Sequence, residues 1–240
     1  MNCIPILALL LVSATSTLAR AQIALPLYTD YEEPPYATAQ PDNLTSQLAA
    51  YLTTASKGAY RFTAVQVPRR RLDALVATPD WKGVIAWGNP NFFSNLPGGS
   101  LLWTSSYMKD TDLVVSLRSK PVNYSGPQSV TGLRVGAIRG WQLNDLDQAI
   151  RSGLIRREYA PTGIANLKKL RAGRVDFILL QGSSMPYYRR EFPDLDDWIY
   201  ISPTPRREFT RHFAVAPLEG KLYEFLQSTA STMPADLFIK

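Results

Sequence analysis

The residue types that most often carry out catalysis are scarce in this sequence. Its 240 residues include one histidine, His212, and one cysteine, Cys3. A bound transition metal needs several imidazole or thiolate ligands, so we expect no metal site and no cofactor. The Gly98-Gly99 pair lacks the lysine of a phosphate-binding loop. No serine motif accompanies His212, which we expect to be a structural or a surface residue. Acid–base chemistry would therefore depend on carboxylates.

Polar and aromatic side chains follow two apolar runs, 133–138 and 175–180, which we predict to be strands. Between these runs the pattern predicts a helix with Asn144 as candidate N-cap, a strand at 154–159 and a second helix with Thr162 as candidate N-cap. Such alternation favours parallel strands. Ligands of open parallel sheets bind beyond the carboxyl ends of the strands. The candidate ligand site is therefore where these ends carry Arg139, Trp141, Gln142 and Gln181.

The other elements predict a mixed α/β chain. The pair Asp42-Asn43 offers an N-cap for a helix that places Leu44, Leu48 and Leu52 on one face. A run at 112–117 and a run at 207–215 are predicted to be strands that cross between two halves of the molecule. The remaining predicted elements are strands at 23–28, 60–67, 83–87 and 198–202, a helix through 72–76 and a terminal helix at 219–233.

Three motifs occur in order along the chain: WTSSY at 103–107, LRVGAIRG at 133–140 and LKKLRAGRVD at 167–176. This ordered set resembles the family 3 extracellular solute-binding proteins, the receptors of polar amino-acid ABC transporters. The resemblance implies an α/β, two-lobed periplasmic binding protein-like II (Venus flytrap) fold with two crossing hinge strands. We predict lobe 1 from residues 22–115 and 213–240, and lobe 2 from residues 116–212.

The resemblance also implies ligand contacts in lobe 1. In the family, the loop after the first strand presents an aromatic ring to the ligand, which makes Tyr31 and Tyr36 candidates; alternatively, they are packed tyrosines of a stiff surface loop. An arginine after the third strand of family members holds the ligand's carboxylate through a bidentate pair. Residues 83–108 contain no Lys, Arg, Asp or Glu, so this clamp is missing. The candidates left there are Trp87, Asn89 and Trp103.

The second ionic anchor of the family is replaced as well. Family members carry an aspartate for the ligand's ammonium five residues after Asp176, where this chain has the neutral amide Gln181. The family's hydroxyl residues after the turn correspond to Trp141 and Gln142. We expect Trp141 to close over a solute, or alternatively to pack under the hinge. Arg139 is the candidate partner for a ligand anion, the alternative being a surface ion pair. These replacements argue against an ordinary α-amino acid.

The N-terminus predicts export. Residues 4–18 are apolar and end in Ala19-Arg20-Ala21, which has the form of a signal-peptidase site, so we predict a signal peptide at 1–21 with cleavage after Ala21. Cys3 lies in this leader, so the mature chain would lack disulfides, which suits a bacterial periplasm. The net charge of +6 is scattered and does not argue for nucleic acid.

The leading interpretation is a periplasmic solute-binding protein, not an enzyme. It would capture a small molecule by hinge closure and act as a monomer with an inner-membrane ABC permease. One alternative is a sensor whose closed form docks on a membrane receptor. Another is an enzyme that resembles cyclohexadienyl dehydratases, with Glu32 or Glu33 as its catalytic carboxylate, although those enzymes resemble binders that keep the clamping arginine.

Overall fold

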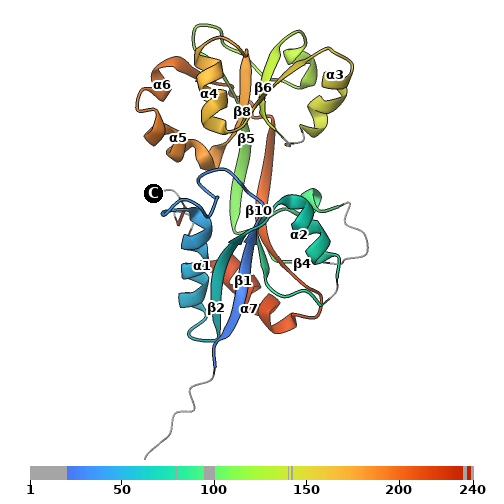
Figure 1. The fold of residues 1–240 in the computed structure, drawn as a ribbon, viewed down its shortest axis with the longest axis vertical. Helices are drawn as coiled ribbons and strands as arrows, with labels where there is room; N and C mark the ends of the chain where they lie inside the picture. Colours follow the sequence, from blue (N-terminus) through green and yellow to red (C-terminus); the bar gives the residue numbers. More distant parts are fainter. Residues whose placement is uncertain are drawn as a thin grey trace, which may run out of the picture.

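Two lobes stacked along the long axis of the molecule are joined by two long strands (Figure 1). The computed structural model describes residues 21–78, 80–94, 101–139, 141, 143–234 and 237–238. Strands β5 (Met108–Leu117) and β10 (Arg207–Val215) pair antiparallel and extend from one lobe into the other. They connect all the main strands into one path with the order β2-β1-β3-β10-β5-β8-β6-β7.

Lobe 1 is a sheet with helices on both faces. Leu48, Leu52 and Leu222 of α1 and α7 pack on one face, and Leu72 and Val76 of α2 pack on the other. Strand residues that alternate along the chain contribute to these two clusters, as expected for the two faces of a sheet. The elements of lobe 1 are β1 (Ile23–Thr29), α1 (Leu44–Ala55), β2 (Tyr60–Gln66), α2 (Arg69–Val76), β3 (Val84–Gly88), the 3-10 helix η1 (Pro90–Phe92), β4 (Leu102–Trp103) and α7 (Gly220–Thr232).

Lobe 2 has the same layered plan. Strand β6 pairs parallel with both β7 and β8, as the sequence predicted. Leu146 packs on one face of this sheet, and Leu167, Leu170 and Leu195 pack on the other. The elements are η2 (Pro127–Val130), β6 (Arg134–Ile138), η3 (Asn144–Leu146), α3 (Asp147–Arg151), β7 (Arg156–Ala160), α4 (Gly163–Arg171), β8 (Phe177–Gln181), η4 (Gly182–Ser184), α5 (Met185–Glu191), α6 (Leu195–Trp198) and β9 (Ile199–Ile201).

Several local predictions are confirmed. Asn43 caps α1, where its side chain accepts a hydrogen bond of 2.7 Å from the Ser46 N–H. Thr162 caps α4 in the same way, through the Ala165 N–H at 3.1 Å. The second crossing strand has its predicted bounds, 207–215. The predicted lobe limits at 115/116 and 212/213 lie inside the two crossing strands and stay a prediction.

The first crossing strand is longer than predicted. It begins at Met108 rather than at Asp112, and the added segment is polar. An apolar-run criterion does not detect a strand whose residues alternate between solvent and a buried ion pair. This difference matters because the added segment carries Asp110. Among the described residues, no helix has the length and apolar character that crossing a bilayer requires.

Candidate functional site between the lobes

A small pocket lies between the lobes next to the crossing strands. Its volume is about 10 Å³, which is room for about one water molecule. Side chains of both lobes form it. Lobe 1 contributes Tyr31, Glu33, Pro34 and Tyr36, and lobe 2 contributes Ile138, Trp141, Leu179, Leu180, Gln181, Ser184 and Tyr188.

Local sequence explains how each lobe reaches this pocket. In lobe 1, the consecutive residues Pro34 and Pro35 exclude a helix and keep the segment after β1 as a loop, which presents Tyr31 and Tyr36 to lobe 2. In lobe 2, the carboxyl ends of the parallel strands β6 and β8 face lobe 1. Strand β6 ends at Ile138, and β8 ends at Gln181. The pocket therefore lies where an open parallel sheet places ligands.

A relay of hydrogen bonds links the two lobes. Ser183 donates its hydroxyl proton to Asp110 Oδ2 at 2.6 Å, so the Tyr36 hydroxyl must be the donor in its 2.5 Å contact with Ser183 Oγ. The Ser183 N–H also donates to Asp110 Oδ1, at 3.0 Å. The carboxylate of Asp110 therefore accepts both a backbone and a side-chain hydrogen bond from Ser183.

Two further bonds cross between the lobes. The Gly163 N–H, in the first turn of α4, donates to Glu33 Oε2 at 3.0 Å. The Gln181 amide donates to the Tyr31 hydroxyl at 3.5 Å. Because side chains of both lobes are bonded to each other, we call this conformation closed.

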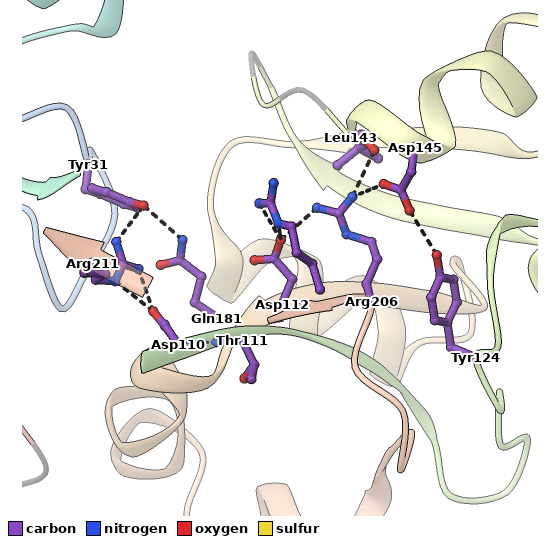
Figure 2. A network of polar contacts seen from close by, with 11 residues as sticks. Tyr31, Asp110, Thr111, Asp112, Tyr124, Leu143, Asp145, Gln181, Arg206 and Arg211 are labelled. Carbon is purple, nitrogen blue, oxygen red and sulfur yellow. Dashed lines mark hydrogen bonds and ion pairs between the residues drawn. The ribbon is translucent and has the colours of Figure 1, made fainter. Parts of the chain in front are cut away.

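A buried ion pair stands at the centre of the hinge (Figure 2). Arg211 of β10 donates to Asp110 of β5 through Nη2 at 2.6 Å and Nε at 3.0 Å, and their side chains are 0% and 1% exposed. Nη1 of Arg211 donates to the Tyr31 hydroxyl at 2.8 Å and to the Trp87 carbonyl at 3.0 Å. The guanidinium is thus held by both crossing strands and by two further segments of lobe 1.

Aromatic rings enclose the same guanidinium. The Arg211 Cζ lies 4.9 Å from the ring centroids of Tyr31 and Tyr36 and 5.1 Å from that of Phe209. Burial opposes the charge of Arg211, but Tyr31, Tyr36 and Asp110 hold its pKa well above the ordinary value. Arg211 and Asp110 together add no net charge to the hinge.

A second ionic cluster joins the hinge to lobe 2 (Figure 2). Asp112 Oδ2 accepts from Arg206 Nη2 and from Arg207 Nη2, both at 2.7 Å. Arg206 also pairs with Asp145, whose other oxygen accepts from the Tyr124 hydroxyl at 3.0 Å. Burial and the Asp145 carboxylate raise the pKa of Tyr124 to about 12. This cluster fixes the return strand to lobe 2.

The pocket contains one carboxyl group whose protonation is perturbed. Burial raises the pKa of Glu33, while the hydrogen bond from the Gly163 N–H acts to lower it. Burial also raises the pKa values of Tyr31 and Tyr36, so both phenols are neutral hydrogen-bonding groups at ordinary pH. Among the described residues, no group of three His, Cys, Asp or Glu side chains is placed to hold a metal ion.

The structure brings four of the predicted contact residues together. Tyr31 and Tyr36 of lobe 1 line the pocket with Trp141 and Gln181 of lobe 2. Gln142 lies outside the described residues. Arg139 is exposed, and its guanidinium lies 5.5 Å from the ring centroid of Tyr159 rather than in the pocket.

The other predicted contacts lie within lobe 1. Trp87 is 1% exposed, and its indole N–H donates to Thr45 Oγ1 at 3.0 Å. Asn89 donates to the Thr210 carbonyl at 2.8 Å. The Trp103 ring covers Gly88, where a Cβ atom would meet it at 2.6 Å. None of Trp87, Asn89 and Trp103 lines the interlobe pocket in this conformation, and their role in ligand binding stays a prediction.

Sequence reasoning missed Arg211 and Asp110 as functional positions, and it named Glu33 only as a candidate catalytic carboxylate of the enzymatic alternative. A signal for Arg211 was available, because strand alternation places it on the same face as Phe209 and Phe213 of a predicted crossing strand. An arginine at an inward position needs a buried carboxylate, and Asp110 and Asp112 stand on the other crossing strand. The diagonal register that brings Arg211 to Asp110 was not readable from the sequence.

Comparison with known proteins identifies the fold. No family model and no curated protein sequence matches the chain significantly. Among solved structures, an ancestral arginine-binding protein bound to arginine superposes with a TM-score of 0.65 at 12% identity, covering 89% of this chain and 93% of that one. The GluR0 ligand-binding core with L-glutamate gives 0.65 at 12% identity, covering 90% and 93%. An ancestral amino-acid-binding protein, a precursor of cyclohexadienyl dehydratase, gives 0.60 at 12%, covering 88% of each chain.

At such low identity these matches establish architecture alone. They extend over nearly the whole chain and agree with two layered lobes, two crossing strands and a pocket between them. The chain has the two-lobed fold of the periplasmic binding proteins.

Proposed function

We propose that this protein binds a small solute between its lobes and that hinge motion opens and closes the site. The observation that carries the proposal is the interlobe pocket, because lobe 1 and lobe 2 each contribute aromatic and polar side chains to one small space. Contacts made by both lobes are what allows a ligand to shift the balance between open and closed forms. The structural neighbours that bind arginine and glutamate favour the same role.

The small volume of the pocket means that the lobes must separate before a solute can enter. A space of about 10 Å³ holds no solute of amino-acid size, so the lobes must move apart before one enters. The Glu33–Gly163 and Tyr36–Ser183 contacts would break in that motion. Their rupture exposes a carboxylate and hydroxyl groups to the incoming solute.

The cellular setting belongs to the same proposal. Export through the predicted leader would place the protein in the periplasm as a monomer that delivers its solute to an inner-membrane ABC permease. Neighbouring genes for a permease and an ATPase would favour this route. An adjacent sensor kinase gene would favour docking on a receptor instead.

A thermal-shift screen tests the proposal. The purified protein is scanned against amino acids, opines, polyamines, aromatic acids and small peptides. A solute at a hundredfold over its dissociation constant stabilises the folded state by about 2.7 kcal/mol, a clear rise in Tm. A folded protein that shows no shift with any of these classes would contradict solute binding.

The enzymatic alternative has one observation in its favour. Glu33 is a partly buried carboxyl with a raised pKa in the pocket, which are properties of a general acid. One structural neighbour is a precursor of cyclohexadienyl dehydratase. None of the described residues that line the pocket is an arginine able to hold the substrate's carboxylate, so we favour binding. Turnover of arogenate by the purified protein, abolished in Glu33→Gln, would reverse that preference.

A further inference from the structure

The described lining of the interlobe pocket carries a negative charge and no positive charge. Among the described residues that line it, Glu33 alone carries a formal charge. The rest of the lining consists of aromatic rings, aliphatic side chains, the Gln181 amide and the Ser184 hydroxyl. A solute in this pocket therefore meets one negative charge and no positive one.

Two basic residues that contact the lining of the pocket, Arg211 and Arg157, are engaged elsewhere. Arg211 contacts Tyr31 and Tyr36 but is 0% exposed and bound to Asp110 through two of its nitrogens. Arg157 lies behind the pocket, where it donates to the Trp141 and Ile138 carbonyls and approaches Asp147 to 3.9 Å.

Arg139 is exposed and lies over the Tyr159 ring. It therefore does not replace the missing clamp. A solute carboxylate brought into the pocket would lose its hydration without gaining a cationic partner, which is costly. It would also stand close to the carboxylate of Glu33.

The same lining suits an organic cation. The faces of tyrosine and tryptophan rings attract ammonium and guanidinium groups, and a desolvated carboxylate pairs with them strongly. The protein itself provides an example at the edge of the pocket, where the Tyr31 and Tyr36 rings flank the guanidinium of Arg211. Glu33 now accepts a single bond from the Gly163 N–H, and opening of the lobes releases that bond.

We propose that the solute of the interlobe pocket is an organic cation, an amine or a guanidinium compound, that carries no carboxylate. Glu33 pairs with its charge, and Trp141 with the tyrosines covers its apolar part. This inference rests on the proposed function of solute binding and specifies the chemical class of the solute.

Matched pairs of solutes that differ by one carboxylate test the inference. Calorimetric titrations of the purified protein compare cadaverine with lysine and agmatine with arginine, and glutamate serves as an anion. We expect each amine to bind at least about tenfold more tightly than its amino acid. Glu33→Gln should weaken amine binding by at least about tenfold, since it removes the charge and keeps the shape. Glu32→Gln, at the exposed neighbouring residue, should leave binding unchanged.

The outcomes separate the inference from the function on which it rests. Lysine, arginine or glutamate binding as tightly as the amines would overturn the inference and leave solute binding intact. Equal amine binding by Glu33→Gln would overturn the assignment of this carboxylate. Absence of binding by every amine would also overturn the inference, and the broad thermal-shift screen would then decide whether the protein binds any solute.

Discussion

At the scale of single residues, the centre of the hinge is the buried guanidinium of Arg211. Arg211 is enclosed by aromatic rings and by Asp110, and no part of it reaches solvent. Burying two charges is expensive, and the cost is recovered only where hydrogen bonds satisfy both groups. Here the Ser183 N–H and hydroxyl complete the partners of Asp110. The Arg211–Asp110 pair therefore joins β10 to β5, and the bonds from Ser183 attach both strands to lobe 2.

Removing one member of this pair should be severe. Arg211→Met leaves the Asp110 carboxylate buried without its cation, and we expect a loss of about 3–5 kcal/mol in the free energy of unfolding, measured by urea denaturation. Adding Asp110→Asn to Arg211→Met should recover part of the loss, because the unpaired charge is gone.

A matched control comes from an exposed pair. Arg189→Met breaks the surface pair with Asp196 and should cost less than about 1 kcal/mol. If Arg211→Met were no more destabilising than Arg189→Met, Arg211 would not have the structural role described.

Trp141 is the residue that most directly reports on the pocket. It lines the space from lobe 2, and its ring is partly exposed. If it covers a solute, Trp141→Ala should weaken solute binding by about 1–3 kcal/mol, as for removal of a buried apolar side chain. Calorimetry with a solute found by screening measures this. Unchanged affinity would remove Trp141 from the site.

At the scale of elements, much of the architecture was predictable and the centre of the hinge was not. Apolar periodicity, the caps Asn43 and Thr162 and the alternation of strands and helices in lobe 2 are local signals, and local signals were sufficient for them. The Asp110–Arg211 contact joins residues 101 positions apart in the sequence. Its formation depends on strand register, which a single sequence does not encode locally.

The candidate site likewise has residues that local sequence patterns could predict and one that they could not. Tyr31, Tyr36, Trp141 and Gln181 follow predicted strands, and the structure places them together. Trp87 also belongs to a predicted strand, but the residue has a φ of 60° and its ring turns into the core of lobe 1. A left-handed backbone at a bulky residue is uncommon and is not visible in a hydrophobic pattern.

Lobe 2 contains an ion-pair cluster of Asp176 with Arg134 and Lys120, which should make the free energy of unfolding depend on pH. Hydrogen bonds from Arg134, and also from Lys120, outweigh burial and hold the pKa of Asp176 far below its usual range. A carboxyl with a lowered pKa in the folded state stabilises the protein above its ordinary pKa, near 3.9, and loses that contribution as pH falls toward the folded-state value. Asp176→Asn should therefore lower the free energy of unfolding at pH 7.

The pH dependence gives this prediction its control. The difference in the free energy of unfolding between wild type and Asp176→Asn should shrink steadily below about pH 4, because the Asp176 carboxyl of the unfolded wild type then takes up a proton while the folded protein keeps its charge. Denaturation curves at pH 7, 5, 4 and 3 measure the gap. A difference that stays constant over this range would mean that Asp176 acts through packing alone.

At the scale of the whole molecule, the closed form is held by the protein's own contacts. Among the described residues, hydrogen bonds of Glu33, Tyr36 and Tyr31 cross from lobe 1 to lobe 2, and the pocket that they enclose is nearly filled. A solute then binds only the open fraction, and its apparent affinity falls in proportion to that fraction. Weakening the interlobe bonds should raise the open population.

Small-angle X-ray scattering measures that population. The solute-free wild type should match the closed structure, and the variant Tyr36→Phe with Ser183→Ala should become more extended, because it loses the relay to Asp110. Tyr200→Phe removes a hydroxyl that bonds to Asn123 within lobe 2 and should leave the profile unchanged. An extended profile for the wild type would contradict a self-closed molecule.

The position of a bound solute tests the central claim most directly. A crystal structure of the protein with a solute found in the thermal-shift screen should show that molecule between the lobes, in contact with Glu33 and Trp141, with the lobes further apart than they are here. A solute bound away from Glu33 and Trp141, for example in the neighbouring groove of about 230 Å³ that Asp42 of lobe 1 and Tyr187 and Arg190 of lobe 2 line, would contradict the account.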